Sequence, residues 1–204
     1  MNNIDERTGK PKIIYHLFAD MGTDTIEYRN KGYDVRCVGK NPGVENSHPD
    51  GLVYGIIANP PCTMFSIART TAKTPRDLRE GMQNVKEALR FIWECQYDLF
   101  ENQRKSNLAF WAIENPATGL LKSFLGNPTF TYCQSEYGAN FTKKTALWGL
   151  FNLPIRPILF NQFPPGHSLG GHYKGNEDLA FTRDGGGKAV CPYNFAKAFF
   201  ETNQ

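Results

Sequence analysis

The chain has 204 residues, enough for one well-buried core and too few for two large domains. Hydrophobic residues make up 40% of it and aromatic residues 13%, which excludes a disordered or low-complexity protein. The net charge of +3 permits a nucleic-acid partner without requiring one. No apolar run approaches the ~20 residues of a membrane span, and the N-terminus has no apolar signal core. We therefore expect a cytoplasmic protein with no membrane partner.

The five cysteines are scattered along the chain and form no C-x-x-C pair. This spacing argues against a disulfide framework and against a zinc site, and it favours a reducing compartment. His167 and His172 are expected to be loop histidines, because no cysteine or acid pair completes a metal site with them. We expect no metal.

Apolar runs and helical patterns alternate along the chain. The expected strands cover residues 12–18, 34–38, 53–58, 108–113, 129–133 and 145–151. A short helix should contain Ile26 and end at Gly32, and a closing helix should cover 194–201. Strands that alternate with helices predict an α/β protein with a mostly parallel sheet and helices on both faces.

A longer amphipathic helix is predicted between the third and fourth strands. Thr74 is expected to be its N-cap and Pro75 its first helical residue. Apolar side chains at helical spacing should form the face that covers the sheet: Leu78, Met82, Val85, Leu89, Ile92 and Leu99. After the sixth strand the composition shifts to proline and glycine, so we expect one domain over 1–204 with a small loop-rich insertion at 152–188.

Two strand ends carry residues that suit catalysis. The run 53–58 is followed by Asn59, Pro60, Pro61 and Cys62, and the run 108–113 by Glu114-Asn115-Pro116. The prolines stop strand pairing and hold extended turns, and ligands meet parallel sheets at such ends. A sulfur nucleophile beside a carboxylic acid predicts covalent catalysis with acid assistance.

These motifs, in this order and spacing, resemble the cytosine-5 DNA methyltransferases, above all short members encoded by bacteriophages. Residues 60–66 are similar to the nucleophile loop Pro-Pro-Cys-x-x-Phe-Ser, and 114–116 are similar to the motif Glu-Asn-Val/Pro. Residues 17–22 resemble the glycine-rich loop that binds S-adenosylmethionine. Tyr137-Gly138 followed by Lys143 resembles a basic motif that approaches the DNA backbone, and 192–200 correspond to the last motif. The resemblance extends from about residue 12 to residue 200.

The resemblance implies a Rossmann-like methyltransferase fold with a minimal target-recognition segment, in the cytoplasm of a bacterium or an infected host cell. It implies methyl transfer from S-adenosylmethionine to C5 of cytosine in DNA, with Cys62 as the covalent nucleophile and Glu114 as the proton donor to N3. The residues implied to bind the cofactor are Phe18, Ala19, Asp20, Met21, Gly22, Thr23, Asp24, Asn59 and Pro60. Those implied to bind nucleic acid are Ser66, Arg69, Lys143 and Lys144.

Two of these roles have alternatives. Asp20 or Asp24 would accept a hydrogen bond from the cofactor's amino group, but Asp24 is equally suited to cap a helix. Arg69 is also a candidate cation to favour the Cys62 thiolate, which otherwise titrates near ~8.5.

The chain departs from the family pattern at several positions. Asp20 and Arg69 replace glycines, Lys40 lies where an acid normally holds the ribose, and Lys143 and Thr145 replace arginines. Only about 35 residues stand where larger relatives have a target-reading domain. Sequence specificity is therefore expected to be short, absent, or supplied by a partner protein.

Other functions remain open at this stage. A catalytically silent relative would bind DNA or cofactor without methyl transfer. An amino-methyltransferase is a further alternative, because residues 59–61 also resemble the Asn-Pro-Pro-aromatic motif of those enzymes, although Cys62 takes the aromatic position. The same cysteine and glutamate would also allow another C5 modification, or action on free nucleotides.

Overall fold

The computed structural model describes residues 3–19, 21–67, 72–96, 108–139, 142–156 and 190–204. Asp20, Arg69 and Leu99 lie outside the described residues, as do residues 157–188 of the predicted insertion 152–188, with His167 and His172. Within the described part, no helix is long and apolar enough to cross a membrane.

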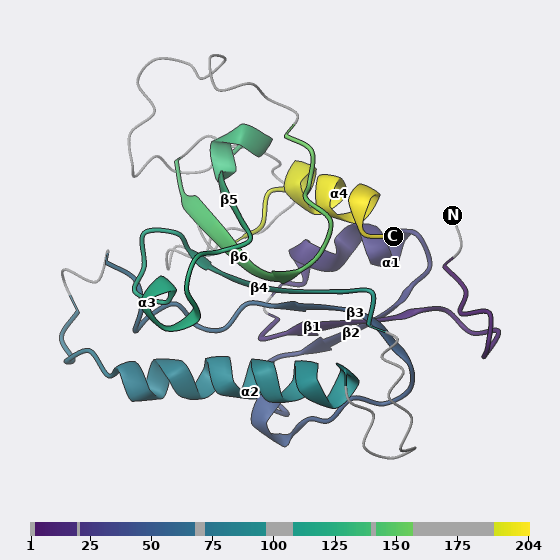
Figure 1. Ribbon diagram of the computed structural model, residues 1–204, viewed down its shortest axis with the longest axis horizontal. Helices are drawn as coiled ribbons and strands as arrows, with labels where there is room; N and C mark the ends of the chain where they lie inside the picture. Colours follow the sequence, from purple (N-terminus) through teal and green to yellow (C-terminus); the bar gives the residue numbers. More distant parts are fainter. Residues whose placement is uncertain (1–2, 20, 68–71, 97–107, 140–141, 157–189) are drawn as a thin grey trace.

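The described residues form an α/β protein around one six-stranded, mostly parallel sheet, as predicted, with strand order β2-β1-β3-β4-β6-β5 (Figure 1). The strands are β1 (Ile13–Leu17), β2 (Asp34–Val38), β3 (Val53–Ala58), β4 (Phe110–Pro116), β5 (Phe130–Cys133) and β6 (Lys144–Leu150). The first four are mutually parallel, and β6 runs antiparallel to both β4 and β5.

Each predicted strand coincides with an observed one, but the fourth extends further than predicted. Residues 114–116 are the last residues of β4 and not a turn that follows it. The cause is β6, whose Leu147, Ala146 and Thr145 pair with these three residues in turn. An antiparallel neighbour therefore keeps Glu114 on a rigid strand.

Helices cover both faces of the sheet (Figure 1). The helix α2 (Leu78–Gln96) lies on one face, and α1 (Ile26–Asn30) and α4 (Tyr193–Thr202) lie on the other, while α3 (Lys122–Leu125) follows β4. Short 3-10 helices complete the described elements: η1 (Thr23–Thr25), η2 (Val44–Asn46) and η3 (Gln134–Tyr137).

The core is divided by the sheet because successive strand side chains point to opposite faces. In β1, Tyr15 and Leu17 pack with Phe91 and Ile92 of α2. Ile14 lies in the opposite cluster, which is dominated by rings from α1, β4 and α4. The side chain of His16, two residues after Ile14, therefore belongs to the α1 and α4 face.

The predicted start of α2 is wrong. The helix begins at Leu78, and Asp77 is the residue that caps it: its Oδ1 atom accepts hydrogen bonds from the backbone N–H groups of Arg79 and Glu80, at 2.8 and 3.2 Å. Thr74 and Pro75 lie outside the helix. A carboxylate caps as well as a hydroxyl and also complements the positive end of the helix dipole, so Asp77 fixes the boundary.

We expect Asp77→Ala to lower the free energy of unfolding by about 1 kcal/mol, because two N–H groups in the first turn of α2 lose their acceptor. Urea denaturation followed by circular dichroism measures this effect. Thr74→Ala is the matched comparison, and a larger loss for that variant than for Asp77→Ala would contradict the observed helix start.

Candidate active site

The carboxyl ends of the parallel strands form the edge where the predicted site residues gather. The strand β1 has β2 on one side and β3 on the other, so the chain order reverses between β1 and β3. Open α/β sheets bind ligands in the crevice outside such a switch point. The segments 18–25 and 59–66 follow these two strands, and Glu114 lies near the end of β4.

The loop that carries Cys62 is a tight turn with a buried anchor. The carbonyl of Cys62 accepts hydrogen bonds from the N–H groups of Phe65 and Ser66, at 2.9 and 2.8 Å. The Phe65 side chain is fully buried in a cluster that includes Val85 of α2 and Trp148 of β6. Moving the Phe65 ring out would expose this apolar cluster to water. The buried ring therefore anchors the loop and limits the movement of Cys62, three residues earlier.

Arg76 holds the same loop from the side, and sequence reasoning missed this role. Its guanidinium donates hydrogen bonds to the carbonyl of Met64 and, at 3.0 Å, to that of Ser66. The close packing continues at Gly81, where an added Cβ would lie 2.9 Å from the Cβ of Met64. These two hydrogen bonds tie the loop to the segment before α2, and no residue pattern in the chain identifies which cation makes them.

Asn115 joins the carboxyl ends of β3 and β4. Its side chain is completely buried, and its Nδ2 atom donates a 3.0 Å hydrogen bond to the carbonyl of Pro60. Pro60 precedes Cys62 by two residues and Asn115 follows Glu114 directly. The predicted nucleophile and the predicted acid are therefore held at one site.

Burial and two nearby charges act on the pKa of the Cys62 thiol. Burial raises the pKa of Cys62, the cation of Lys143 lowers it, and the charge of Glu114 raises it again. The Nζ atom of Lys143 lies 3.6 Å from Oε1 of Glu114. The net effect is a raised thiol pKa, so the resting form of Cys62 is the protonated thiol.

The two lysines predicted to bind nucleic acid occupy different environments. Lys143 pairs with Glu114 inside the site, whereas Lys144 is exposed at the start of β6. Ser66 lies in the Cys62 loop with its carbonyl bound by Arg76. The fourth predicted residue, Arg69, is outside the described residues.

The loop after β1 has an unusual backbone. Phe18 has a φ of +57°, in the left-handed region that side chains other than glycine rarely adopt. The N–H of Ala19 donates to the carbonyl of Val38 at 3.0 Å, and a Cβ at Gly39 would lie 3.0 Å from the Ala19 carbonyl. Strained backbone of this kind is concentrated at ligand sites. Met21, by contrast, is half exposed.

Asp24 turns toward the crevice instead of capping a helix. It lies within η1, and neither η1 nor α1 has a side-chain cap, so the helix-cap interpretation is wrong. Its carboxylate is buried and accepts a 3.1 Å hydrogen bond from Nδ2 of Asn59, the first residue after β3. The segments after β1 and β3 are thus joined by side chains.

Three buried residues near this crevice were missed by sequence reasoning. They are His16 of β1, Tyr132 of β5 and Cys191, which precedes α4. Burial is the main cause that raises the pKa of Tyr132 and of Cys191 well above their usual values, and the charges of Asp24 and Glu114 add to it. The charges of both acids therefore act on the same two buried residues, which no sequence spacing indicates.

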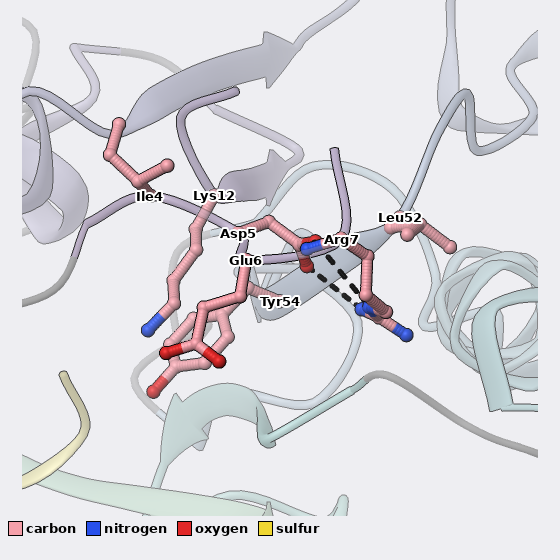
Figure 2. Close-up of a pocket in the computed structure, with 7 residues that line it drawn as sticks. All are labelled: Ile4, Asp5, Glu6, Arg7, Lys12, Leu52 and Tyr54. Carbon is pink, nitrogen blue, oxygen red and sulfur yellow. Dashed lines mark hydrogen bonds and ion pairs between the residues drawn. The ribbon is translucent and has the colours of Figure 1, made fainter. Parts of the chain in front are cut away.

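A cavity of about 350 Å³ lies elsewhere, beside the N-terminal segment (Figure 2). Lys12 and Leu52 directly precede β1 and β3, so this cavity is at the opposite end of the strands from Cys62. Asp5 and Arg7 pair with each other there at 2.8 Å. Among the described residues, no group of three or more His, Cys, Asp or Glu side chains is placed to hold a metal ion.

No family model matches the chain, and no curated protein matches it significantly.

The charges around Cys62 predict how fast iodoacetamide alkylates it. We expect Glu114→Gln to speed alkylation at pH 7.5 and Lys143→Gln to slow it, because these variants lower and raise the thiol pKa respectively. A full pKa unit changes the thiolate fraction about tenfold, so the expected changes are roughly threefold to tenfold. Peptide mass spectrometry after timed quenching follows Cys62 separately from the exposed Cys37.

Lys144→Gln is the matched control for this experiment, because Lys144 is the exposed neighbour of Lys143. Its alkylation rate should equal that of the wild type. Equal rates for Glu114→Gln, Lys143→Gln and wild type would show that the three groups do not share a site.

Proposed function

We propose that the protein is a DNA cytosine-5 methyltransferase that uses S-adenosylmethionine, with Cys62 as nucleophile and Glu114 as the acid. The observation that carries the proposal is the buried Asn115–Pro60 hydrogen bond, which holds a cysteine loop and a glutamate at one edge of the sheet. The α/β sheet with its switch point is compatible with a Rossmann-like methyltransferase fold.

The residues at the crevice fit the cofactor. The Oδ1 atom of Asn59 is buried and has no hydrogen-bond partner among the described residues, so it is an acceptor that a bound ligand would satisfy. The loops that follow β1 and β2 approach each other closely, at Ala19 and Gly39, and the Phe18 backbone in the first loop is strained. Residues 18–24 with Asn59 and Pro60 would hold the cofactor, which supplies an electrophilic methyl group.

The chemistry requires C5 of cytosine to become a nucleophile. The Cys62 thiolate adds to C6, which places electron density on C5 and N3 of the ring. A proton on Glu114 passes to N3 and prevents charge from accumulating there. After the methyl group has been transferred to C5, the C5 proton is lost to water and the sulfur leaves C6 as a thiolate. The N3 proton returns through Glu114 to this sulfur, which restores the thiol.

The electrostatics of the site support a proton route from Cys62 to the base. Cys62 rests as a thiol, and Glu114 pairs with Lys143. When the thiol attacks, its proton moves to Glu114 and from there to N3, so the site gains no net charge. Lys143 stays beside both groups and lowers the cost of the thiolate.

DNA must reach Cys62 from the solvent-exposed side of the site. The target carbon is inaccessible inside a duplex, so the cytosine must be flipped out or unpaired. Lys144 is exposed near the site and suits a backbone phosphate. With so short a recognition segment, a partner protein is the candidate source of sequence specificity.

Incubating the protein with labelled S-adenosylmethionine and DNA containing 5-fluorocytosine tests the proposal. Fluorine blocks loss of the C5 substituent, so we expect a denaturation-resistant protein–DNA adduct. Cys62→Ser should abolish the adduct, while Cys95→Ser, a matched change in the last turn of α2, should retain it. Both single-stranded and duplex DNA are assayed.

Other results would assign another function. Label on an amino group of adenine or cytosine, with no adduct, would identify an amino-methyltransferase. Cofactor binding without transfer to any nucleic acid would identify a silent relative.

The acid role of Glu114 has its own test. We expect Glu114→Gln to slow methyl transfer by about 100-fold or more, because the amide cannot take the thiol proton and give it to N3. Single-turnover transfer of tritiated methyl measures this rate. An unchanged rate would remove Glu114 from the mechanism, even if the same variant alkylates faster at Cys62.

A further inference from the structure

Gln134 is a buried amide directly after β5. It begins η3, and only 2% of its surface is exposed. Its Oε1 atom is buried and has no hydrogen-bond partner among the described residues. A buried amide oxygen without a partner is costly, because the hydrogen bonds that it made to water are not replaced. Packing alone therefore does not explain an amide at this position.

A second buried amide shows how a structural role differs. The Oδ1 atom of Asn203 accepts a hydrogen bond from the N–H of Asn152 at 2.7 Å. Its Nδ2 atom donates to the carbonyls of Asn152 and Phe199, both at 2.9 Å, so the end of α4 is held to the segment after β6. The backbone N–H of Gln134 is used similarly, by the carbonyl of Lys143 at 2.9 Å, but its Oε1 atom is left as an acceptor for a ligand.

The strand register places the Gln134 side chain on the face of the sheet that carries Glu114. Tyr132 precedes Gln134 by two residues along extended backbone, and its ring stacks on Phe195 of α4 at 4.0 Å. Gln134 lies opposite Lys143 in the continuation of the β5–β6 pairing, and opposed residues of antiparallel strands point to the same face. The Nζ atom of Lys143 lies 3.6 Å from Oε1 of Glu114. Gln134 is therefore the neighbour of the lysine that contacts the proposed acid.

The group on C4 distinguishes cytosine from the other pyrimidines. In cytosine it is an amino group, which donates hydrogen bonds, whereas in uracil and thymine it is a carbonyl, which accepts them. C4 is bonded to N3, the atom that receives the proton of Glu114 in the proposed reaction. An amide oxygen close to Glu114 suits the amino group and is unfavourable for the carbonyl.

We propose that Gln134 selects cytosine as the target base, with its Oε1 atom accepting a hydrogen bond from the amino group on C4. This inference rests on the proposed function. Glu114 and Gln134 then contact adjacent positions on one edge of the pyrimidine, the acid at N3 and the amide at C4. Uracil in the same place would leave two buried acceptors facing each other without a donor, which polar sites reject strongly.

Adduct formation on three DNA molecules tests the proposal. The methylated cytosine is first located with 5-fluorocytosine DNA, and that position alone is then replaced by 5-fluorouracil or by 5-fluoropyrimidin-2-one, which lacks the amino group. We expect the full chain with S-adenosylmethionine to trap the cytosine DNA at least about 100-fold faster than the uracil DNA. Gln134→Met should slow trapping of the cytosine DNA about tenfold to 100-fold and that of the pyrimidin-2-one DNA by less than about threefold. Each base is compared with itself in the two proteins, so differences in intrinsic reactivity cancel.

Two further variants complete the experiment. Gln134→Asn keeps an amide that is one methylene shorter, so it should lose the preference for cytosine as Gln134→Met does, and it carries the test if the methionine variant does not fold. Gln83→Met is the matched control on α2, where the Gln83 amide donates to Glu87 at 2.7 Å. It should leave all three trapping rates unchanged. Thermal unfolding followed by circular dichroism verifies that each variant is folded.

Similar trapping of cytosine and uracil DNA by the wild type would overturn the proposal without any variant, because the site would not distinguish a donor from an acceptor on C4. Equal slowing of cytosine and pyrimidin-2-one DNA by Gln134→Met would also overturn it and show a structural amide. Both outcomes leave the proposed methyltransferase function standing, since the cytosine DNA is still trapped. The absence of an adduct with 5-fluorocytosine DNA would overturn the base selection together with the proposed function.

Discussion

The hydrogen bond from Asn115 to the carbonyl of Pro60 is the contact on which the site depends. It is completely buried, where an unpaired amide or carbonyl would be costly, so it strongly favours one arrangement of β4 and the Cys62 loop. Glu114 and Cys62 flank its two ends. Neither residue has to contact the other directly, because the backbone between them is already fixed.

The surrounding packing explains why this loop can hold a reactive group in place. Phe65 is inserted into the core below, and Arg76 binds two loop carbonyls from the side. The N–H of Leu120 donates to the carbonyl of Phe65 at 2.9 Å, so the segment after β4 contacts the loop as well. A site held to within fractions of an ångström needs such support, because small displacements reduce catalysis strongly.

Local patterns predicted the sheet well because strand runs and turn residues are short-range signals. The apolar run alone predicted the strand 53–58, and the two prolines predicted that it ends before 59–62. The start of α2 was not, because Thr74 and Asp77 are both good caps and only packing decides between them. The partners of the site were also hidden: Tyr132 and Cys191 lie within reach of the charges of Asp24 and Glu114, and His16 lies 3.7 Å from Asp24, although these residues are far apart in the sequence. No periodicity encodes that convergence.

The two carboxylates near the carboxyl ends of the strands have different partners. On the β4 side, the carboxylate of Glu114 already has a cation, Lys143, and a thiol whose proton it can accept. On the β1 side, the carboxylate of Asp24 accepts a hydrogen bond from the Asn59 amide and lies 3.7 Å from the His16 imidazole. The two carboxylates are not isolated from each other, because the charges of both act on the buried side chains of Tyr132 and Cys191. A change at either acid is therefore felt by the same two buried groups.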